Sequence, residues 1–322
     1  MSYVGPDFDP PQPRRPRRSP LTVAVAALVP GALLGWLVYE AVGGSGDGGG
    51  ASRATVRSSA TATSSAPASS PSGDAKNPSS PAPTLASPTS SAPAASGPLK
   101  GKVVVIDPGH NPGNFQHAAE INRKVDIGTN LKECDTTGTS TNSGYTEAQF
   151  TLDVSHRLKA LLEKQGATVV LTHDGNSPAW GPCVDKRAQI GNKAHADAAI
   201  SIHADGSAAG NRGFHVILPG SVHAGAADTR PIVASSADLG ERIAGNFVRV
   251  TGEPPSNYVG GGTGLVTRKD LGGLNLSTVP KVFIECGNMR DSKDAALLTS
   301  GAWRQKAAQG ISEGIVSFLH GS

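Results

Sequence analysis

The sequence is poor in aromatic residues and in cysteine, and most of it has no excess of one charge. Only 14 of the 322 residues are Phe, Trp or Tyr, whereas Gly and Pro together number 64, so much of the chain cannot bury a hydrophobic core. Three cysteines are too few for a disulfide-built miniprotein and leave room for one bridge and one free thiol. From Leu99 onward the chain carries 22 Lys and Arg against 21 Asp and Glu, and this balance argues against a nucleic-acid-binding protein.

The N-terminal part begins with a tail and an apolar segment. Residues 1–20 are rich in Pro and Arg and have no apolar periodicity, so we expect a disordered cytoplasmic tail. Within residues 21–42, Leu21–Tyr39 is an uncharged run about as long as a membrane-spanning helix, and the preceding arginines place the N-terminus in the cytoplasm. The segment Leu21–Val42 is therefore either a membrane anchor or a cleaved signal peptide, and both alternatives export the rest of the chain.

A linker and one domain follow. Residues 43–98 consist mainly of Gly, Ser, Ala, Thr and Pro and contain no aromatic residue. Because such a stretch cannot offset its ordering entropy by burial, we expect a disordered linker. Residues 99–322 are numerous enough for one domain with a sizeable core.

Short β-branched runs alternate with amphipathic stretches in this domain. The patterns predict strands at 102–107, 167–172, 198–203, 213–218 and 281–285, and helices at 147–165, 184–194, 235–250 and 303–319. Strands that alternate with helices imply an α/β fold, in which a single layered sheet has helices on both faces.

Polar residues of the kind that bind metals follow three of the predicted strands. The first strand runs into His110, the strand at 198–203 ends at His203, and the last strand ends at Glu285. Ligands of open α/β sheets bind beyond the carboxyl ends of the strands. Two histidines and a carboxylate could therefore converge on one point.

Glu147 could complete such a site. It opens a predicted helix and shares a face with Phe150, Thr151 and Val154, by the spacing i, i+3, i+4 and i+7. That face points at the sheet, where a carboxylate must be paired or bound to metal. The alternative interpretation is a carboxylate favoured by the helix macrodipole. Glu120 is an alternative ligand, but no helix is predicted to hold it.

The combined motifs resemble a known enzyme family. The segments VVIDPGH, SIHADG and FIECGNM, with the helix-opening Glu, are similar to those of the zinc-dependent N-acetylmuramoyl-L-alanine amidases of the Amidase_3 type. The likeness spans about residues 100–320 and is closest to secreted mycobacterial members, which have similar CDTTGTSTNSGYTE, GPCVDKRA and GLNL segments. It implies a twisted, mostly parallel sheet of six strands. It also implies cleavage of the amide between the lactyl group of N-acetylmuramic acid and L-alanine of the peptidoglycan stem peptide.

The resemblance also implies roles for individual residues. Zn²⁺ would be bound by His110, Glu147 and His203, and Glu285 would be the catalytic carboxylate. Two neutral imidazoles and one carboxylate leave a fourth position open, as catalytic zinc requires. Glu285 would take a proton from water and return it to the departing nitrogen. Asp107 is expected to orient His110 or a nearby backbone turn.

Cysteine chemistry and one long connection add three expectations. Cys134 and Cys183 lie in two loops of an exported domain, where an oxidising compartment favours their pairing. Cys286 lies in a strand and is expected to be a buried free thiol. Residues 111–133 belong to an unusually long connection, and we expect them to form a flap that can cover the site. His215 is expected to be a core or edge histidine.

Two other functions remain open on the residues alone. The protein could be a zinc peptidase acting within the stem peptide, or a non-catalytic wall-binding protein on the same fold. The presence of all candidate ligands and of Glu285 argues against the binding protein. In each case peptidoglycan is the expected partner, and the domain, expected to be monomeric, lies outside the membrane or in the cell wall.

Overall fold

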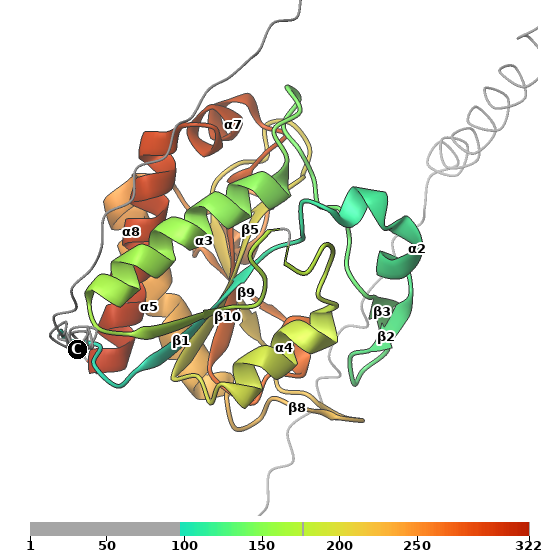
Figure 1. The fold of residues 1–322 in the computed structure, drawn as a ribbon. Coiled ribbons are helices and arrows are strands. Elements are labelled where there is room, and N and C mark those ends of the chain that lie inside the picture. Colours follow the sequence, from blue (N-terminus) through green and yellow to red (C-terminus); the bar gives the residue numbers. More distant parts are fainter. Residues whose placement is uncertain (1–96, 176, 322) are drawn as a thin grey trace, which may run out of the picture. The chain divides into compact units, whose positions relative to one another are not determined.

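The structure, a computed structural model, describes residues 97–175 and 177–321 (Figure 1). The predicted tail at 1–20, the anchor or signal peptide at 21–42 and the linker up to residue 96 lie outside the described residues. Within the part that is described, every helix is too short or too polar to span a lipid bilayer.

A six-stranded sheet forms the centre of the domain, in the order β4-β1-β5-β10-β6-β9 (Figure 1). The strands are β1 (Val103–Pro108), β4 (Thr168–Leu171), β5 (Ala198–Asp205), β6 (His215–Pro219), β9 (Leu265–Arg268) and β10 (Lys281–Asn288). Four of the five neighbouring pairs are parallel, and the pair of β10 and β6 is antiparallel. The α/β fold with a mostly parallel sheet is therefore confirmed.

Helices cover both faces of this sheet. One face packs against α3 (Glu147–Lys164), α5 (Val233–Thr251) and α8 (Gly301–His320), whereas α4 (Val184–Lys193) and α6 (Gly272–Asn275) lie on the other (Figure 1). The alternation of side chains along β1 reflects these two layers. Val104 and Ile106 belong to the large core under α3, α5 and α8, and Val105 belongs to a small cluster on the opposite face.

The two faces differ sharply in polarity. The large core takes the apolar side chains of β1, β5 and β10, including Ile200 and Ile284. The alternate positions of the same strands are mostly polar, and they include Asp107, Ser201 and His203. One extensive core thus holds the sheet, and the opposite face combines a small apolar cluster with polar groups.

Several elements were not predicted. They are η1 (Asn114–Gln116), α2 (Ala118–Ile121), β2 (Lys124–Asp126), β3 (Leu131–Glu133), β7 (His223–Ala224), β8 (Ala227–Asp228), β9, η2 (Gly260–Gly262), α6 and α7 (Ser292–Leu298). Most of them are two to four residues long. Segments this short contain too few residues to show a period of 2 or 3.6.

Helices α5 and α8 pack so closely that a larger residue at their contact should destabilise the fold. A Cβ atom added to Gly314 of α8 would lie 2.5 Å from the Cα of Ile243 in α5. We expect Gly314→Ala to lower the free energy of unfolding by about 1–3 kcal/mol, because the two helices must move apart. For a domain of this size the melting temperature should fall by roughly 2–4 °C per kcal/mol.

Gly245 of α5 provides the matched control, because an added Cβ would meet no atom within 4 Å. Gly245→Ala should raise stability by up to about 1 kcal/mol through helix propensity. Thermal melts of both variants check the pair of expectations. Equal stability of the two variants would contradict the close packing of α5 and α8.

Candidate metal centre

Three of the candidate ligands meet where β1 and β5 end and α3 begins. His110 follows β1, His203 lies near the end of β5, and Glu147 is the first residue of α3. Potential ligand atoms of the three side chains all lie within 4.8 Å of one another. Glu147 lies between the histidines, with Oε2 3.1 Å from Nε2 of His110 and Oε1 2.9 Å from Nδ1 of His203. This group could hold a metal ion.

The start of α3 fixes the position of Glu147. Thr146 is the N-cap and forms a reciprocal capping box with Gln149. The carboxylate of Glu147 is buried and accepts hydrogen bonds from the backbone N–H of Thr139 at 2.9 Å and of Ala204 at 3.2 Å. Glu147 therefore lies at a helix N-terminus and also faces inward, as its spacing predicted.

Backbone conformation brings the histidines close to each other. His110 has a φ of 61°, in the left-handed region that few non-glycine residues adopt. The preceding residue must be glycine for a different reason, because a Cβ at Gly109 would lie 2.4 Å from Cε1 of His203. A Cβ at Gly138 would lie 2.7 Å from Cδ2 of His110, so the segment around Gly138 passes directly against the cluster.

Glu285 lies next to this cluster on the neighbouring strand. It is paired in register with His203 across β5 and β10, so the two side chains share one face of the sheet. Its Oε2 atom is buried and has no hydrogen-bond partner. Burial, together with the charges of Glu147 and Asp205, raises the pKa of Glu285 well above its ordinary value. A bound cation would relieve this unfavourable arrangement.

The protonation of His110 and Glu147 is coupled. Burial disfavours a charge on His110, but the carboxylates of Glu147 and Asp135 outweigh it and raise the pKa of His110 to about 10. Burial also disfavours ionisation of Glu147, but His110 and His203 outweigh it and keep the pKa of Glu147 below its ordinary range. In the absence of metal, a proton on His110 thus pairs with Glu147. A metal ion must displace that proton, so its affinity should weaken as the pH falls.

The donor set fits a divalent metal. Two imidazoles and one carboxylate are a usual ligand set of catalytic zinc, which keeps a fourth position open. The unpaired carboxylate of Glu285 is a second observation that agrees with a cation at this place. The three candidate ligands come from the ends of β1 and β5 and the start of α3, and Glu285 lies within β10.

The other titratable candidates lie elsewhere or play other parts. Glu120 has an exposed carboxylate 3.5 Å from His117 and does not belong to the cluster. His156 is exposed and pairs with Asp174. His215 is buried on β6, as expected for a core histidine, but it lies opposite Glu285 in the register and its Nδ1 has no hydrogen-bond partner.

A cavity of about 230 Å³ opens beside the cluster. His110, His203 and Phe283 line it, and the rings of His203 and Phe283 are stacked with centroids 5.3 Å apart. Lys132 and Glu133 of β3 form another part of the wall. The segment predicted to be a flap thus borders the cavity, while its ability to cover the site stays a prediction.

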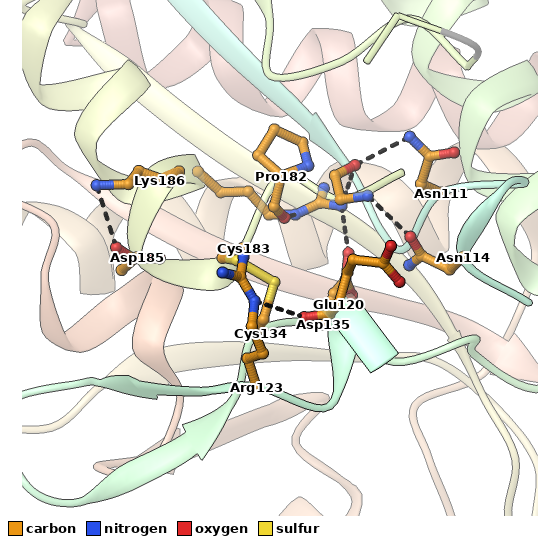
Figure 2. Close-up of a disulfide and its surroundings, with 12 residues drawn as sticks. Asn111, Asn114, Glu120, Arg123, Cys134, Asp135, Pro182, Cys183, Asp185 and Lys186 are labelled. Atoms are coloured by element: carbon orange, nitrogen blue, oxygen red, sulfur yellow. Dashed lines mark hydrogen bonds and ion pairs between the residues drawn. A yellow bond between two sulfur atoms is a disulfide. The ribbon is translucent and has the colours of Figure 1, made fainter. Parts of the chain in front are cut away.

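The expected disulfide is present between Cys134 and Cys183 (Figure 2). Cys134 lies just after β3 and Cys183 is the N-cap of α4, so the bond joins the end of the long connection to a helix. Cys286 is buried and free, as predicted.

Asp107 makes no hydrogen bond or ion pair with His110 among the contacts of the described residues. Its buried carboxylate accepts hydrogen bonds from Thr172 at 2.7 Å and Ser201 at 2.9 Å, and it pairs with Lys281 and Arg187. Arg187 in turn donates to the carbonyl oxygens near His110. Asp107 is therefore connected to the backbone turn at His110 through Arg187, and its role in orienting that turn stays a prediction.

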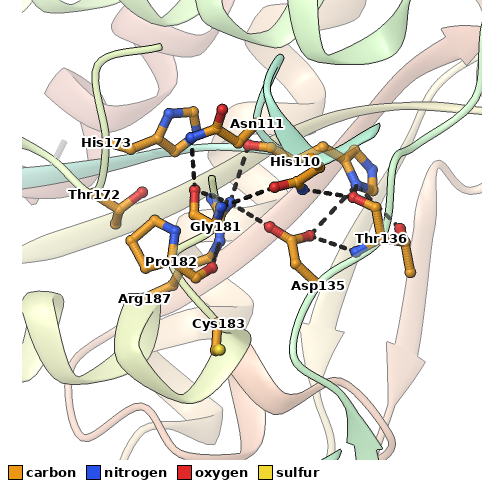
Figure 3. A network of polar contacts seen from close by, with 12 residues as sticks. His110, Asn111, Asp135, Thr136, Thr172, His173, Gly181, Pro182, Cys183 and Arg187 are labelled. Carbon is orange, nitrogen blue, oxygen red and sulfur yellow. Dashed lines mark hydrogen bonds and ion pairs between the residues drawn. The ribbon is translucent and has the colours of Figure 1, made fainter. Parts of the chain in front are cut away.

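Arg187 and Asp135 were not singled out from the sequence, yet they lie directly behind His110 (Figure 3). The guanidinium of Arg187 is buried and joins Asp107 and Asp135, at 2.9 and 2.8 Å. Oδ1 of Asp135 lies 3.6 Å from Nδ1 of His110, and the carbonyl oxygen of Thr136 lies 3.1 Å from the same nitrogen. A signal was available, because Arg187, Ala188 and Gly191 follow the inward spacing of α4.

Comparison with known proteins agrees with this geometry. A family model described as N-acetylmuramoyl-L-alanine amidase, Amidase_3, matches residues 104–317. The chain is 42% identical over 222 residues to N-acetylmuramoyl-L-alanine amidase Rv3717 of Mycobacterium tuberculosis. The aligned region covers 69% of this chain and 88% of the relative.

Two crystal structures of mycobacterial amidases match the fold. Ami1 from Mycobacterium smegmatis aligns with a TM-score of 0.63 and 38% identity, over 70% of this chain and 99% of that one. Ami1 from Mycobacterium abscessus aligns with a TM-score of 0.61 and 38% identity, over 69% and 100% of the two chains. The resemblance drawn from the motifs is confirmed, and the chain belongs to the Amidase_3 family of N-acetylmuramoyl-L-alanine amidases.

Proposed function

We propose that the protein is a zinc-dependent peptidoglycan hydrolase that cleaves the amide bond between N-acetylmuramic acid and L-alanine of the stem peptide. The observation that carries the proposal is the cluster of His110, Glu147 and His203 beside an unpaired carboxylate, in a chain of the Amidase_3 family. The three clustered side chains are the proposed zinc ligands, and Glu285 is the proposed catalytic carboxylate.

The ligand residues are positioned before any metal binds. Glu147 is held by two backbone N–H groups, and Nδ1 of His110 is directed at the carbonyl oxygen of Thr136. In the neutral ring this contact favours the tautomer with its proton on Nδ1, so Nε2 becomes available to a metal once the proton that it shares with Glu147 is displaced. When bound, Zn²⁺ is a Lewis acid that makes water a nucleophile near neutral pH and polarises a carbonyl group.

Glu285 supplies the proton transfer. A general base must accept a proton from water and return it to the nitrogen that departs, and a carboxylate performs both steps. The raised pKa of Glu285, caused by its burial and by the nearby charge of Glu147, favours holding that proton between the two steps. Its Oε2 atom has no hydrogen-bond partner in the protein and is therefore free for this role.

The alternatives differ in their products. A peptidase acting within the stem peptide would leave L-alanine attached to the sugar, and a wall-binding protein would release nothing. Mass spectrometry of muropeptides digested with the protein should show intact stem peptides that begin with a new L-alanine N-terminus. Shortened peptides without that N-terminus would replace the amidase proposal with the peptidase.

Removal of the metal should abolish hydrolysis, and Zn²⁺ should restore it. We expect His110→Ala, Glu147→Ala and His203→Ala each to lose the bound metal, because three protein ligands are needed to retain it at a catalytic site. Elemental analysis of the purified variants measures the zinc content. Glu120→Ala is the matched control and should keep one zinc per chain. Zinc retained by Glu147→Ala and lost by Glu120→Ala would exchange the two assignments.

Glu285→Gln should keep its zinc and lose roughly 10²–10⁴ in rate, the usual contribution of a positioned general acid–base group. The substitution preserves the size of the side chain and removes its basic oxygen. Turnover of muropeptides at equal zinc content measures the loss. Near-normal turnover with the metal in place would remove Glu285 from the mechanism.

We also propose that the domain works outside the cytoplasm as a monomer. The Cys134–Cys183 disulfide supports this location, because such bonds persist in oxidising compartments. The uncharged run in Leu21–Val42 supports either a membrane anchor or a cleaved signal peptide. Peptidoglycan, which lies in the same compartment, is the proposed partner.

A further inference from the structure

The disulfide and the candidate metal ligand His110 are connected by a short chain of buried polar contacts. Cys134 directly precedes Asp135, and Cys183 lies four residues before Arg187 at the start of α4. Figure 2 shows the disulfide beside Asp135. The backbone N–H of Val184 also donates to the carbonyl oxygen of Cys134, at 2.7 Å. The two segments are thus joined by a covalent bond and a hydrogen bond.

Arg187, which lies close to this disulfide on α4, holds the backbone at His110 by hydrogen bonds. Its guanidinium donates to the carbonyl oxygen of His110 at 3.0 Å, and its Nε donates to that of Pro182 at 2.7 Å (Figure 3). The guanidinium also donates to the carbonyl oxygen of Pro108 at 2.6 Å. The left-handed φ of His110 is an unfavourable conformation for a side chain of this kind, so it needs such support. A planar guanidinium can satisfy several acceptors at fixed angles, which a lysine cannot do.

Asp135 contacts both Arg187 and the imidazole ring of His110. Its Oδ2 accepts from Arg187 at 2.8 Å, its Oδ1 accepts from the backbone N–H of Thr136 at 2.8 Å, and the same Oδ1 faces Nδ1 of His110 at 3.6 Å. The carbonyl oxygen of Thr136, which lies 3.1 Å from Nδ1, also accepts a hydrogen bond from the side chain of Asn114 at 2.7 Å. Asp135 therefore acts on His110 through its charge, and it also holds the backbone N–H of Thr136, the residue whose carbonyl oxygen faces the ring.

We propose that Arg187 and Asp135 are positioning residues for the metal ligand His110, and that the Cys134–Cys183 disulfide holds them against it and so sets the metal affinity. The inference rests on the proposed metal site. Residues behind a ligating histidine fix the direction of its ring, and their loss typically weakens metal binding 10- to 100-fold. A network that only stabilised the fold would not alter the affinity.

The direct test compares zinc affinity with stability in the whole chain. The zinc dissociation constant is measured at fixed pH by competition with a chromophoric chelator, and thermal melts of the metal-free protein report folding. Asp135→Asn keeps the shape of the side chain, and we expect it to bind zinc about 10- to 100-fold more weakly. Cys134→Ser/Cys183→Ser should weaken binding in the same direction while all three ligands are present.

Glu253→Gln is the matched control. Glu253 is also buried and also pairs with an arginine, Arg212, at 3.1 Å, but neither residue contacts the cluster. Burial and the nearby charge of Asp294 raise the pKa of Glu253 to about 7, and Glu253→Gln removes the charge that this residue can place opposite Arg212. This variant should change the melting temperature without changing the zinc dissociation constant.

The outcomes separate this inference from the proposed function. Absence of zinc binding by the wild-type protein would overturn the metal site itself. Wild-type binding with Asp135→Asn and the double cysteine variant within twofold of it, all folded, would overturn only the positioning role. Should these variants not fold, the wild-type protein is reduced with a phosphine below its melting temperature. Unchanged zinc affinity after reduction would then overturn the role of the disulfide and its network.

Discussion

The pairing of Arg187 with two buried carboxylates is the interaction on which the site depends. Asp107 lies at the end of β1 and Asp135 follows the disulfide, and neither could remain ionised in the interior without a cation. Arg187 and Lys281 keep the pKa of Asp107 below its ordinary range despite its burial. The same guanidinium reaches the carbonyl oxygen of His110. The same contacts of Arg187 therefore neutralise buried charge and hold the backbone at His110, a candidate metal ligand.

The fold tolerates these buried charges because its apolar core and its polar groups lie on different faces of the sheet. The large apolar core lies between the sheet and α3, α5 and α8, and it includes Phe150 and Ile202. The opposite face of the central strands can then carry charged residues without loss of the hydrophobic free energy that holds the sheet. Glu147 connects the two sides, because α3 packs on the apolar face while its first residue reaches over the end of the sheet.

The sequence predicted the helices and strands whose apolar residues recur with a regular spacing. The central strands and the long helices were found within a few residues of their bounds, and Glu147 is buried at the start of α3, as its spacing predicted. Edge strand β9 was missed because four half-exposed residues carry no clear alternation. The contacts of Asp135 could not be predicted, because they follow from a positive φ at His110 and from loops that carry no periodic signal.

Glu285 differs from Asp107, Asp135 and Glu147 because its buried Oε2 atom has no hydrogen-bond partner. Buried carboxylates elsewhere in the domain have partners, such as Arg187 for Asp107 and Arg212 for Glu253. Glu285 lies beside Glu147 without one, which costs stability in the metal-free protein. A carboxylate that was fully hydrogen-bonded would be a weak base, since every donor lowers its pKa. The metal-free domain thus gives up some stability at one position on the sheet, and the carboxylate at that position stays basic, as the proposed acid–base role of Glu285 requires.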